Sequence, residues 1–438
     1  MRFSKSGRIA LATAASLFIG LGTQSCYYYT EAYIIVTGSQ YNQVASYREQ
    51  NQTGKLQAAP GDPLSSGGTD PVRAVLLTGG RYVYVLNEGK PAVQSDNSIQ
   101  WTGANISLFS VGGDGGLSYQ LSYPSQGTGS IRLALNTGSS VLYVLDTYQP
   151  GATPNTTPAS PTYSAATPCY DATYDVYRPA GDITAFSIQS STGRLFLITN
   201  QQQQNSQGSA LTYFPIGCGA IDFRYLSNYI YTGEASDPAT GNTQVVYAYQ
   251  ANPNGQLIQV PGGAQPVGTQ SMAYIGQSAN GLYLYILDNG TNNIFIFTPS
   301  AGLLSSIATG AVPNTGGSGM TSIVTDAQSK YVYVTNTQST GLGQASSIIT
   351  AYEIIGGGTL EALPTGLPTG NLFTTGSGPQ CIFEDPSHQY LYTADAISST
   401  VTGAEFDPNT GILKNLANGS TFTTVGTPTW CLYSSNTD

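Results

Sequence analysis

Histidine is almost missing from this sequence, because His388 is the only one among 438 residues. A metal centre built from several histidines is therefore excluded, and a Ser-His-Asp or Cys-His site would have to use this one residue. His388 lies in the segment Asp385-Pro-Ser-His-Gln-Tyr390, which is typical of a solvated turn between two strands. The sequence also lacks a Gly-rich phosphate loop followed by Lys and Ser or Thr, and we expect no cofactor.

Charge is scarce, since Asp, Glu, Lys and Arg make up only 9% of the chain. The 14 basic residues are outnumbered by 24 acidic ones, and no run of Lys or Arg interleaved with aromatic residues occurs. Such a surface repels phosphate backbones, so we expect no nucleic-acid partner. The same charge balance disfavours direct binding to anionic membrane surfaces.

Long apolar runs are missing apart from a short one near the N-terminus. Residues 1–25 combine basic residues, an apolar run from Ile9 to Gly22 and small residues, which is typical of an export signal. The run is too short to span a bilayer. Cys26 follows where a bacterial lipoprotein carries its lipid, although the preceding residues depart from the usual Leu-led pattern. We expect an exported protein of the bacterial cell envelope, periplasmic or outer-membrane-anchored, with a lipid on Cys26 as its membrane contact; ordinary cleavage before Cys26 is the alternative.

Cysteine is scarce too, and none of the residues after Cys26 forms a CxxC pair, so a zinc or redox site has little support. Four cysteines remain in the mature chain: Cys169, Cys218, Cys381 and Cys431. An even number in an oxidising compartment allows two disulfides, and buried free thiols are the alternative. A stretch rich in Asp and Asn, from Asp288 to Asn293, is expected to be a hairpin turn rather than a calcium site, so no metal is predicted.

What the sequence has in abundance is a repeated pattern, an alternating run of aromatic and β-branched residues. Its seven copies start 48 to 87 residues apart, at Tyr33, Tyr82, Leu142, Tyr229, Tyr283, Tyr331 and Tyr390. The copies share a shorter apolar strand upstream, a turn, a third strand downstream and, after a Gly-bearing turn, a fourth short strand. Four antiparallel strands in about 40–50 residues are typical of a propeller blade, and larger spacings indicate loop insertions.

We therefore predict an all-β protein, a seven-bladed β-propeller of four-stranded antiparallel blades that forms a single domain over residues 26–438. A long polar insertion around residues 148–181 interrupts it. The first copy has no room for an upstream strand, whereas Gly426–Tyr433 at the C-terminus has no run after it. We expect this last strand to join the first blade and close the ring, which also removes two free sheet edges.

The copy Tyr331-Val-Tyr-Val-Thr-Asn336, with related forms in every unit, resembles the YVTN-type seven-bladed propellers. Within them the chain resembles the lactonase-like family that includes 6-phosphogluconolactonases, over nearly all of its mature length. In that family the upstream strand commonly reads Gly-Pro-Arg-His, and the tyrosine run ends in an Asn-Glu pair. Arg73, Asn87 and Glu88 match this pattern, but Ala74 stands where the histidine would be. The resemblance implies the fold; it implies activity only weakly, because propellers host many functions.

The next unit keeps Arg132 at the corresponding place and ends its run at Asp146. If the upstream strands line the central channel, Arg73 and Arg132 could converge with Asn87 on one anionic or carbonyl-bearing ligand. If the chain is an enzyme, the groups present fit a lactone hydrolase, in which an arginine polarises the carbonyl and Glu88 or Asp146 activates water. The alternative is that each arginine pairs with a nearby carboxylate of the protein.

Cys381 and Cys431 occupy similar places on the upstream strands of the last and first blades, which are adjacent in a closed ring. We predict a disulfide between them, and a second one between Cys169 and Cys218 that would pin the long insertion to the fourth blade.

Most of the 31 tyrosines lie in alternating strands and are expected to pack between blades. Aromatic residues outside those strands are the candidates for recognising a glycan or peptide: Trp101, Tyr148, Tyr163 and Tyr170. Our leading prediction is a monomeric, non-catalytic envelope protein that binds a small molecule, glycan or protein on a face of the propeller. The rival is an exported hydrolase that opens a sugar lactone or related ester.

Overall fold

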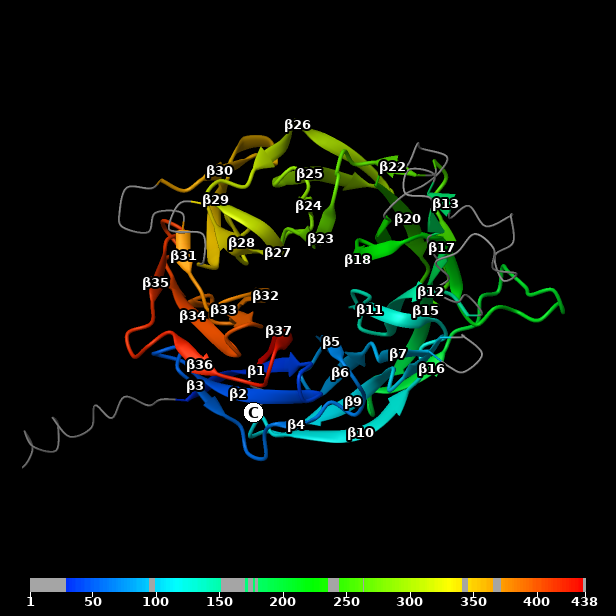
Figure 1. Ribbon diagram of the computed structural model, residues 1–438, viewed down its shortest axis with the longest axis horizontal. Coiled ribbons are helices and arrows are strands. Elements are labelled where there is room, and N and C mark those ends of the chain that lie inside the picture. The colour runs from blue at the N-terminus through cyan, green and yellow to red at the C-terminus, as the bar shows by residue number, and fades with distance from the viewer. Residues whose placement is uncertain are drawn as a thin grey trace, which may run out of the picture.

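The computed structural model describes residues 29–93, 99–150, 170–171, 176–177, 180–234, 244–262, 264–340, 346–364 and 372–435. Within them, seven antiparallel sheets stand side by side in a ring around a central axis (Figure 1). The 3-10 turn η2 (Gly356–Gly358) is the only helical element of this part of the chain. No helix in the described residues has the length and apolar character needed to cross a membrane. The predicted seven-bladed, all-β architecture is confirmed.

Each blade has four main strands, which run in order from the centre of the ring outward. Blade 1 contains β37 (Pro428–Ser435), β1 (Thr30–Gly38), β2 (Gln43–Gln50) and β3 (Leu56–Ala58). Blade 2 contains β5 (Pro71–Leu76), β6 (Tyr82–Asn87), β9 (Asn105–Val111) and β10 (Leu117–Tyr123). Blade 3 contains β11 (Thr128–Leu135), β12 (Val141–Tyr148), β15 (Ala180–Gln189) and β16 (Arg194–Leu197). Blade 4 contains β18 (Ala220–Leu226), β19 (Tyr229–Glu234), β20 (Val245–Ala251) and β21 (Leu257–Gln259).

The remaining three blades follow the same order. Blade 5 contains β23 (Met272–Gln277), β24 (Leu284–Asp288), β25 (Asn293–Ser300) and β26 (Leu303–Pro313). Blade 6 contains β27 (Gly317–Thr325), β28 (Tyr331–Ser339), β29 (Ile348–Ile354) and β30 (Leu360–Ala362). Blade 7 contains β32 (Pro379–Glu384), β33 (Tyr390–Asp395), β34 (Thr400–Phe406) and β35 (Leu413–Asn415).

Short additional strands extend this plan. In five blades a further strand pairs with the third one: β4 (Leu64–Ser65), β17 (Phe214–Cys218), β22 (Gln265–Pro266), β31 (Leu372–Thr374) and β36 (Thr421–Thr423). Two small hairpins lie outside the blades, β7 (Lys90–Val93) with β8 (Ile99–Thr102) and β13 (Tyr170–Asp171) with β14 (Val176–Tyr177).

The repeated aromatic and β-branched run forms the second strand of every blade, where both faces of the strand are covered by neighbouring blades. Its side chains are accordingly buried along almost the whole strand, as in β24 and β33. A tyrosine hydroxyl in one blade commonly reaches a turn of the next: Tyr84 donates to the Gly193 carbonyl over 2.7 Å, and Tyr333 to the Gly411 carbonyl over 2.8 Å. The predicted packing of tyrosines between blades is confirmed.

The turn at Gly411 shows why these positions need glycine. Its φ is +70°, and a Cβ there would lie 2.5 Å from the ring of Tyr331. Only glycine combines that backbone conformation with so close an approach of the ring.

The C-terminal strand closes the ring. Strand β37 pairs antiparallel with β1 from Ala32↔Ser435 to Gly38↔Pro428, and it is the innermost strand of blade 1 (Figure 1). A disulfide joins Cys381 of β32 to Cys431 of β37, with the Cα atoms 5.8 Å apart. Both the closure and this pairing are as predicted, so the last and first blades are held together by a covalent bond as well as by hydrogen bonds.

The two faces of the ring differ in their loops, because strand direction alternates within each blade. We call the face where the innermost strands begin the insertion face, since the connection between the second and third strands also emerges there. It carries the longest such connections, residues 88–104 in blade 2 and 149–179 in blade 3. We call the face where the innermost strands end the turn face, and it carries tight turns such as that between Glu384 and Tyr390. Most of the insertion predicted around residues 148–181 lies outside the described residues.

A buried carboxyl group at the seam of blades 7 and 1 predicts an unusual pH dependence. Burial, and then the negative charge of Asp385, raise the pKa of Glu49 from 4.5 to about 9, against the hydrogen bond from the Tyr392 hydroxyl. Between these two values the folded protein binds a proton that the unfolded chain has released. The stability that Glu49 contributes is therefore full below about pH 4.5 and falls as pH rises towards 9, by about 1.4 kcal/mol per pH unit.

The measurement is urea unfolding at intervals from pH 5 to pH 8. We expect the midpoint to fall with pH for the wild type, and Glu49→Gln to make this fall less steep, because other buried acids with raised pKa values remain. The control Glu361→Gln replaces an exposed acid of β30 and should leave the slope unchanged. A wild-type midpoint that rises from pH 5 to pH 8 would contradict the assignment.

Candidate functional site

Arg73 lies at the centre of the ring, on the innermost strand of blade 2, and its neighbours come from its own strand and from blade 1. Its Nη1 donates to the Val72 carbonyl over 2.7 Å and to the Thr429 carbonyl over 3.4 Å. The guanidinium carbon stands 4.3 Å from the centroid of the Trp430 ring. Burial, and then the positive charge of Arg132, lower the pKa of Arg73. The guanidinium is thus already held by carbonyl oxygens and an aromatic face.

Arg132, on the innermost strand of blade 3, is paired with a carboxylate of the next blade. Its Nε lies 2.5 Å from Oδ1 of Asp222, whose side chain is only 2% exposed. The other carboxylate oxygen, Oδ2, accepts a hydrogen bond of 2.8 Å from the backbone N–H of Ile275 in blade 5. Asp222 therefore neutralises Arg132 and ties three neighbouring blades together. The structure therefore has the alternative arrangement for Arg132, in which the arginine pairs with a carboxylate of the protein.

Glu88 lies close enough to both arginines for their charges to act on it, and its side chain makes no hydrogen bond or ion pair in the described residues. Burial, and then the negative charge of Asp70, raise the pKa of Glu88 to about 7, while the positive charges of Arg132 and Arg73 act in the opposite direction. At neutral pH this carboxyl group is therefore divided between its two protonation states. It can accept or donate a proton or a hydrogen bond.

Asn87 ends the second strand of blade 2, Asp146 lies two residues before the end of the second strand of blade 3, and both are fully buried. The Asn87 amide donates to the Ser66 carbonyl, Asn105 Oδ1 and Ser107 Oγ. Asp146 accepts hydrogen bonds from four donors: the hydroxyls of Ser125, Ser130 and Thr184 and the backbone N–H of Gly127. These contacts tie the second strand to the loop that enters its blade. None of them involves Arg73 or Arg132.

The carboxyl group of Asp146 faces a second acid across the sheet. It pairs in register with Asp182 of β15, and burial raises the pKa of Asp146 to about 6 despite its hydrogen-bond donors. Burial and then the charge of Asp146 hold the pKa of Asp182 well above its ordinary range. Two buried carboxyl groups in contact share a proton, because both cannot ionise at so short a distance.

The aromatic candidates Trp101 and Tyr148 meet on the insertion face. Trp101 lies on β8, Tyr148 ends β12, and their ring centroids are 6.0 Å apart with an interplanar angle of 42°. Both side chains are partly exposed. The negative charge of Glu88 contributes to the raised pKa of Tyr148, after burial, so Glu88 lies near enough to Tyr148 for its charge to act on that hydroxyl group. Tyr163 lies outside the described residues, and only the backbone of Tyr170 is described.

A solvent-open cavity of about 400 Å³ lies on the axis, towards the C-terminal ends of the innermost strands. We call it the axial cavity; aliphatic side chains form most of its wall, and the aromatic rings that line it are Tyr274, Phe383, Trp430 and Tyr433. Arg224 of β18 is its one charged lining residue. Sequence reasoning missed Arg224 and Asp222, which stand two residues apart on one innermost strand. The feature of the sequence that could have identified both is a charged residue within an otherwise apolar strand.

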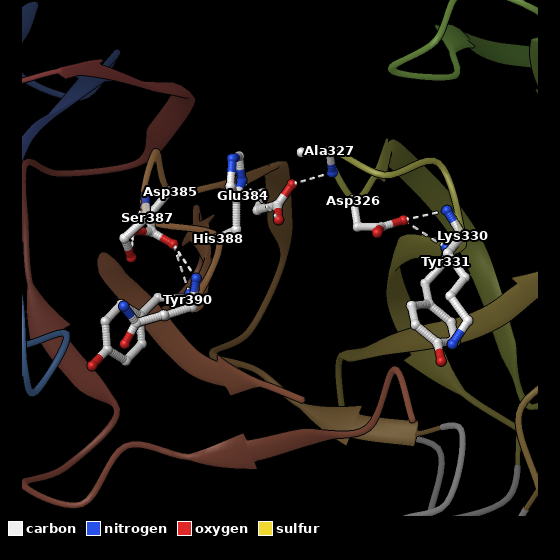
Figure 2. A network of polar contacts seen from close by, with 10 residues as sticks. Asp326, Ala327, Lys330, Tyr331, Glu384, Asp385, Ser387, His388 and Tyr390 are labelled. Atoms are coloured by element: carbon white, nitrogen blue, oxygen red, sulfur yellow. Dashed lines mark hydrogen bonds and ion pairs between the residues drawn. The ribbon is translucent and has the colours of Figure 1, made fainter. Parts of the chain in front are cut away.

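His388 occupies a turn, as expected, and Asp288 is the last residue of β24, directly before the turn that leads to Asn293. His388 has a φ of +58°, its side chain is 57% exposed, and its Nδ1 lies 3.2 Å from Oε1 of Glu384 (Figure 2). Both oxygens of Asp288 accept hydrogen bonds from nearby backbone N–H groups, among them those of Gln270 and Thr291. Within the described residues no group of three or more His, Cys, Asp or Glu side chains is placed to hold a metal ion.

Two of the predicted cysteine roles concern side chains that the structure does not describe. Cys26 and Cys169 lie outside the described residues, and only the backbone of Cys218 is described. The lipid on Cys26 and the Cys169–Cys218 bridge therefore stay predictions.

No protein-family model matches the chain, and no curated protein sequence matches it. Solved structures do. A putative 6-phosphogluconolactonase from Bacteroides fragilis superposes with a TM-score of 0.63 at 16% identity, over 92% of this chain and 98% of that one. A second, from Bacteroides uniformis, gives 0.64 at 15% identity over 92% and 100%. The periplasmic gluconolactonase of Pseudomonas aeruginosa gives 0.61 at 13% identity over 92% and 99%. What they share is the fold. The resemblance seen in the sequence thus extends to structural neighbours that are named lactonases.

Proposed function

We propose that this propeller is a non-catalytic binding module that holds a small sugar-type ligand on its insertion face. The observation that carries the proposal is the Trp101–Tyr148 ring pair on this face, with the charge of Glu88 acting on Tyr148. Aromatic rings present flat apolar surfaces that suit the C–H faces of a sugar, and a carboxyl group offers hydrogen bonds to its hydroxyls. A few placed polar groups beside aromatic side chains are the ordinary composition of a small-molecule site.

The arginines argue for binding over catalysis. An electrophilic arginine needs free N–H donors aimed at the reacting carbonyl. Arg132 is instead paired with Asp222. Nη1 of Arg73 is held by two carbonyl oxygens and its guanidinium face by the Trp430 ring, while its Nε is buried without a partner and is closed to solvent. Both are therefore suited to setting the electrostatic environment of Glu88 from below the ligand.

The second candidate function is a lactone hydrolase, and one observation favours it. Glu88, with a pKa raised to about 7, has the character of a general base at neutral pH. The structural neighbours are named as lactonases, although at 13–16% identity they carry only the fold to this chain. In this case Glu88 would activate a water molecule for attack on the lactone carbonyl.

We also propose that the chain is exported and held at the bacterial cell envelope by a lipid on Cys26. The support is the order of basic, apolar and small residues before this cysteine. Metabolic labelling with an alkyne fatty acid tests it, and a wild-type chain that takes up no label would contradict it.

The binding proposal predicts a sharp loss on removing Trp101. The chain has two tryptophans, so Trp430→Phe leaves Trp101 as the only one and its fluorescence reports on the insertion face. We expect saturable changes on titration with glucose, N-acetylglucosamine or cellobiose. In wild-type protein, Trp101→Ala should weaken the same ligand more than tenfold by calorimetry, because aromatic anchors carry much of the free energy of binding.

The matched control is Phe196→Ala, which removes an aromatic ring that is 55% exposed on the outer strand of blade 3. It should bind sugar as the wild type does. Gluconolactone decides between the two candidate functions: ring opening above the spontaneous rate, lost in Glu88→Gln, would establish the hydrolase. Equal sugar affinity in Trp101→Ala and the wild type would refute the proposal that the sugar binds at Trp101.

A further inference from the structure

The axial cavity on the turn face is a second site, distinct from the insertion face. At about 400 Å³ it falls within the range of pockets that enclose small organic molecules. The residues that line it come from the innermost strands of all seven blades. Such a wall is rigid, because every strand in it is paired and the ring is closed by β37. The cavity is therefore pre-formed.

A layer of packed side chains separates the two sites. Trp430 and Tyr274 line the axial cavity, with ring centroids 6.4 Å apart and an interplanar angle of 30°. Arg73 lies against the Trp430 ring and is not itself a lining residue. Arg73, Arg132 and Glu88 are not among the lining residues of the axial cavity, so the two sites use different side chains.

Arg224 gives the cavity its chemical character. It is the only charged residue among the lining side chains, and its guanidinium group makes no hydrogen bond or ion pair in the described part of the chain. A guanidinium group beside apolar walls, without a protein partner, is ready for a planar anion, since its N–H groups match a carboxylate in a two-point contact. The chemistry of Arg224 therefore favours a ligand that carries a carboxylate.

The walls decide what the carboxylate is attached to. Four aromatic rings line the cavity, from Tyr274, Phe383, Trp430 and Tyr433, and the other lining residues besides Arg224 are aliphatic or cysteine. Such walls favour an apolar, aromatic body over a hydroxylated one, because hydroxyl groups would lose water without gaining partners. We propose that the axial cavity binds an aromatic monocarboxylate, with its carboxylate on Arg224 and its ring among these aromatic side chains.

Acidic groups near the cavity do not compete for Arg224. Glu384 and Asp385 affect the pKa of Tyr433, so they lie near this end of the ring. The Glu384 carboxylate is occupied by the backbone N–H of Ala327, 2.7 Å away, and by His388 (Figure 2). Asp385 accepts from backbone N–H groups of its own turn, including that of Tyr390 at 2.7 Å (Figure 2). Both carboxylates are committed to the turns.

Trp430 is a natural reporter for this site. In the variant Trp101→Phe it is the only tryptophan of the full chain. We expect its fluorescence to change saturably with phenylacetate. Phenylacetamide has nearly the same shape without the charge, and we expect it to bind at least tenfold more weakly, because a hydrogen-bonded ion pair is lost.

The variant Arg224→Gln should weaken phenylacetate about tenfold to hundredfold and remove the preference over the amide. Arg224→Lys should restore part of the affinity, since it keeps the charge without the planar fork. Arg194→Gln, which removes an exposed arginine of β16, is the matched control and should bind as the parent does.

Three results would overturn the proposal: no saturable change up to about 10 mM phenylacetate in folded protein, equal affinity for acid and amide, or undiminished binding in Arg224→Gln. If Arg224→Gln loses its cooperative thermal transition, the acid–amide comparison in the parent decides alone. The outcome is independent of the sugar proposal, because that proposal is read from Trp101 and this one from Trp430.

Discussion

Replacing Asp222 with alanine is expected to lower the free energy of unfolding by about 3–5 kcal/mol, the usual cost of leaving a buried charge without its partner. The change removes the carboxylate from Arg132, which lies 2.5 Å away, and the acceptor from the backbone N–H of Ile275. The positive charges of Arg73 and Arg132 would then repel each other, with Glu88 as the carboxyl group that still acts on both. Urea unfolding followed by circular dichroism measures the loss.

Two further variants separate charge from shape. Asp222→Asn keeps an acceptor for the Ile275 N–H and should cost less than Asp222→Ala. The double variant Asp222→Ala with Arg132→Met removes both partners, and we expect it to recover much of the stability, because a buried ion pair can be exchanged for apolar groups at little cost. A loss below about 1 kcal/mol in Asp222→Ala would mean that water reaches Arg132 and that the Arg132–Asp222 pair is exposed to solvent.

The disulfide between Cys381 and Cys431 is expected to contribute about 4 kcal/mol. It spans 50 residues of chain, and in the unfolded state this loop loses much of its conformational entropy when closed. The double variant Cys381→Ala with Cys431→Ala should therefore unfold at a clearly lower guanidinium concentration than the wild type. The two side chains are buried, at 0% and 4% exposure, so part of the loss will come from packing.

Reduction distinguishes these two contributions. Unfolding of the wild type in dithiothreitol removes the bond but keeps the sulfur atoms, and the fall in midpoint then reports the cross-link alone. The double variant should show no such fall from this pair. A variant with Cys169 and Cys218 both replaced by alanine keeps the Cys381–Cys431 bridge and should retain the wild-type response. If reduction leaves the midpoint of the wild type unchanged, the bridge has no stabilising role.

The architecture was open to prediction because the pattern that specifies it is local and repeated. A second strand that is buried on both faces must be apolar along its length, so it stands out in each unit, as in Tyr331–Val334. Seven copies then count the blades. The closure follows from one missing and one surplus strand, and the Cys381–Cys431 bridge follows from the closure.

The site was harder to predict, because its contacts join blades that are far apart in sequence. Arg132 is paired with Asp222, 90 residues away, and the sequence offered a carboxylate partner as an alternative without saying which one. Asn87 and Asp146 look functional because they end a recognisable motif. Their position is polar for a structural reason, since it holds the loop entering each blade.

The axial cavity could not be inferred from the sequence at all. Whether the centre of a ring is filled or hollow depends on the side-chain volumes of seven innermost strands at the same height. Arg224 becomes notable only once its neighbours are known to be apolar and its guanidinium group to lack a partner among the described residues. Its charge alone did not distinguish Arg224 from Arg132, which has a carboxylate partner in Asp222.

The pairing of Ala32 with Ser435 brings the first and last described strands together at one face of the ring. Both ends of the described chain leave the ring on the turn face, on the same side as the axial cavity. If the proposed lipid on Cys26 holds the chain at a membrane, the turn face would be directed towards that membrane. The insertion face, with Trp101 and Tyr148, would then face the surrounding medium. A sugar would then arrive from outside, whereas an apolar acid would be delivered from the side of the anchor.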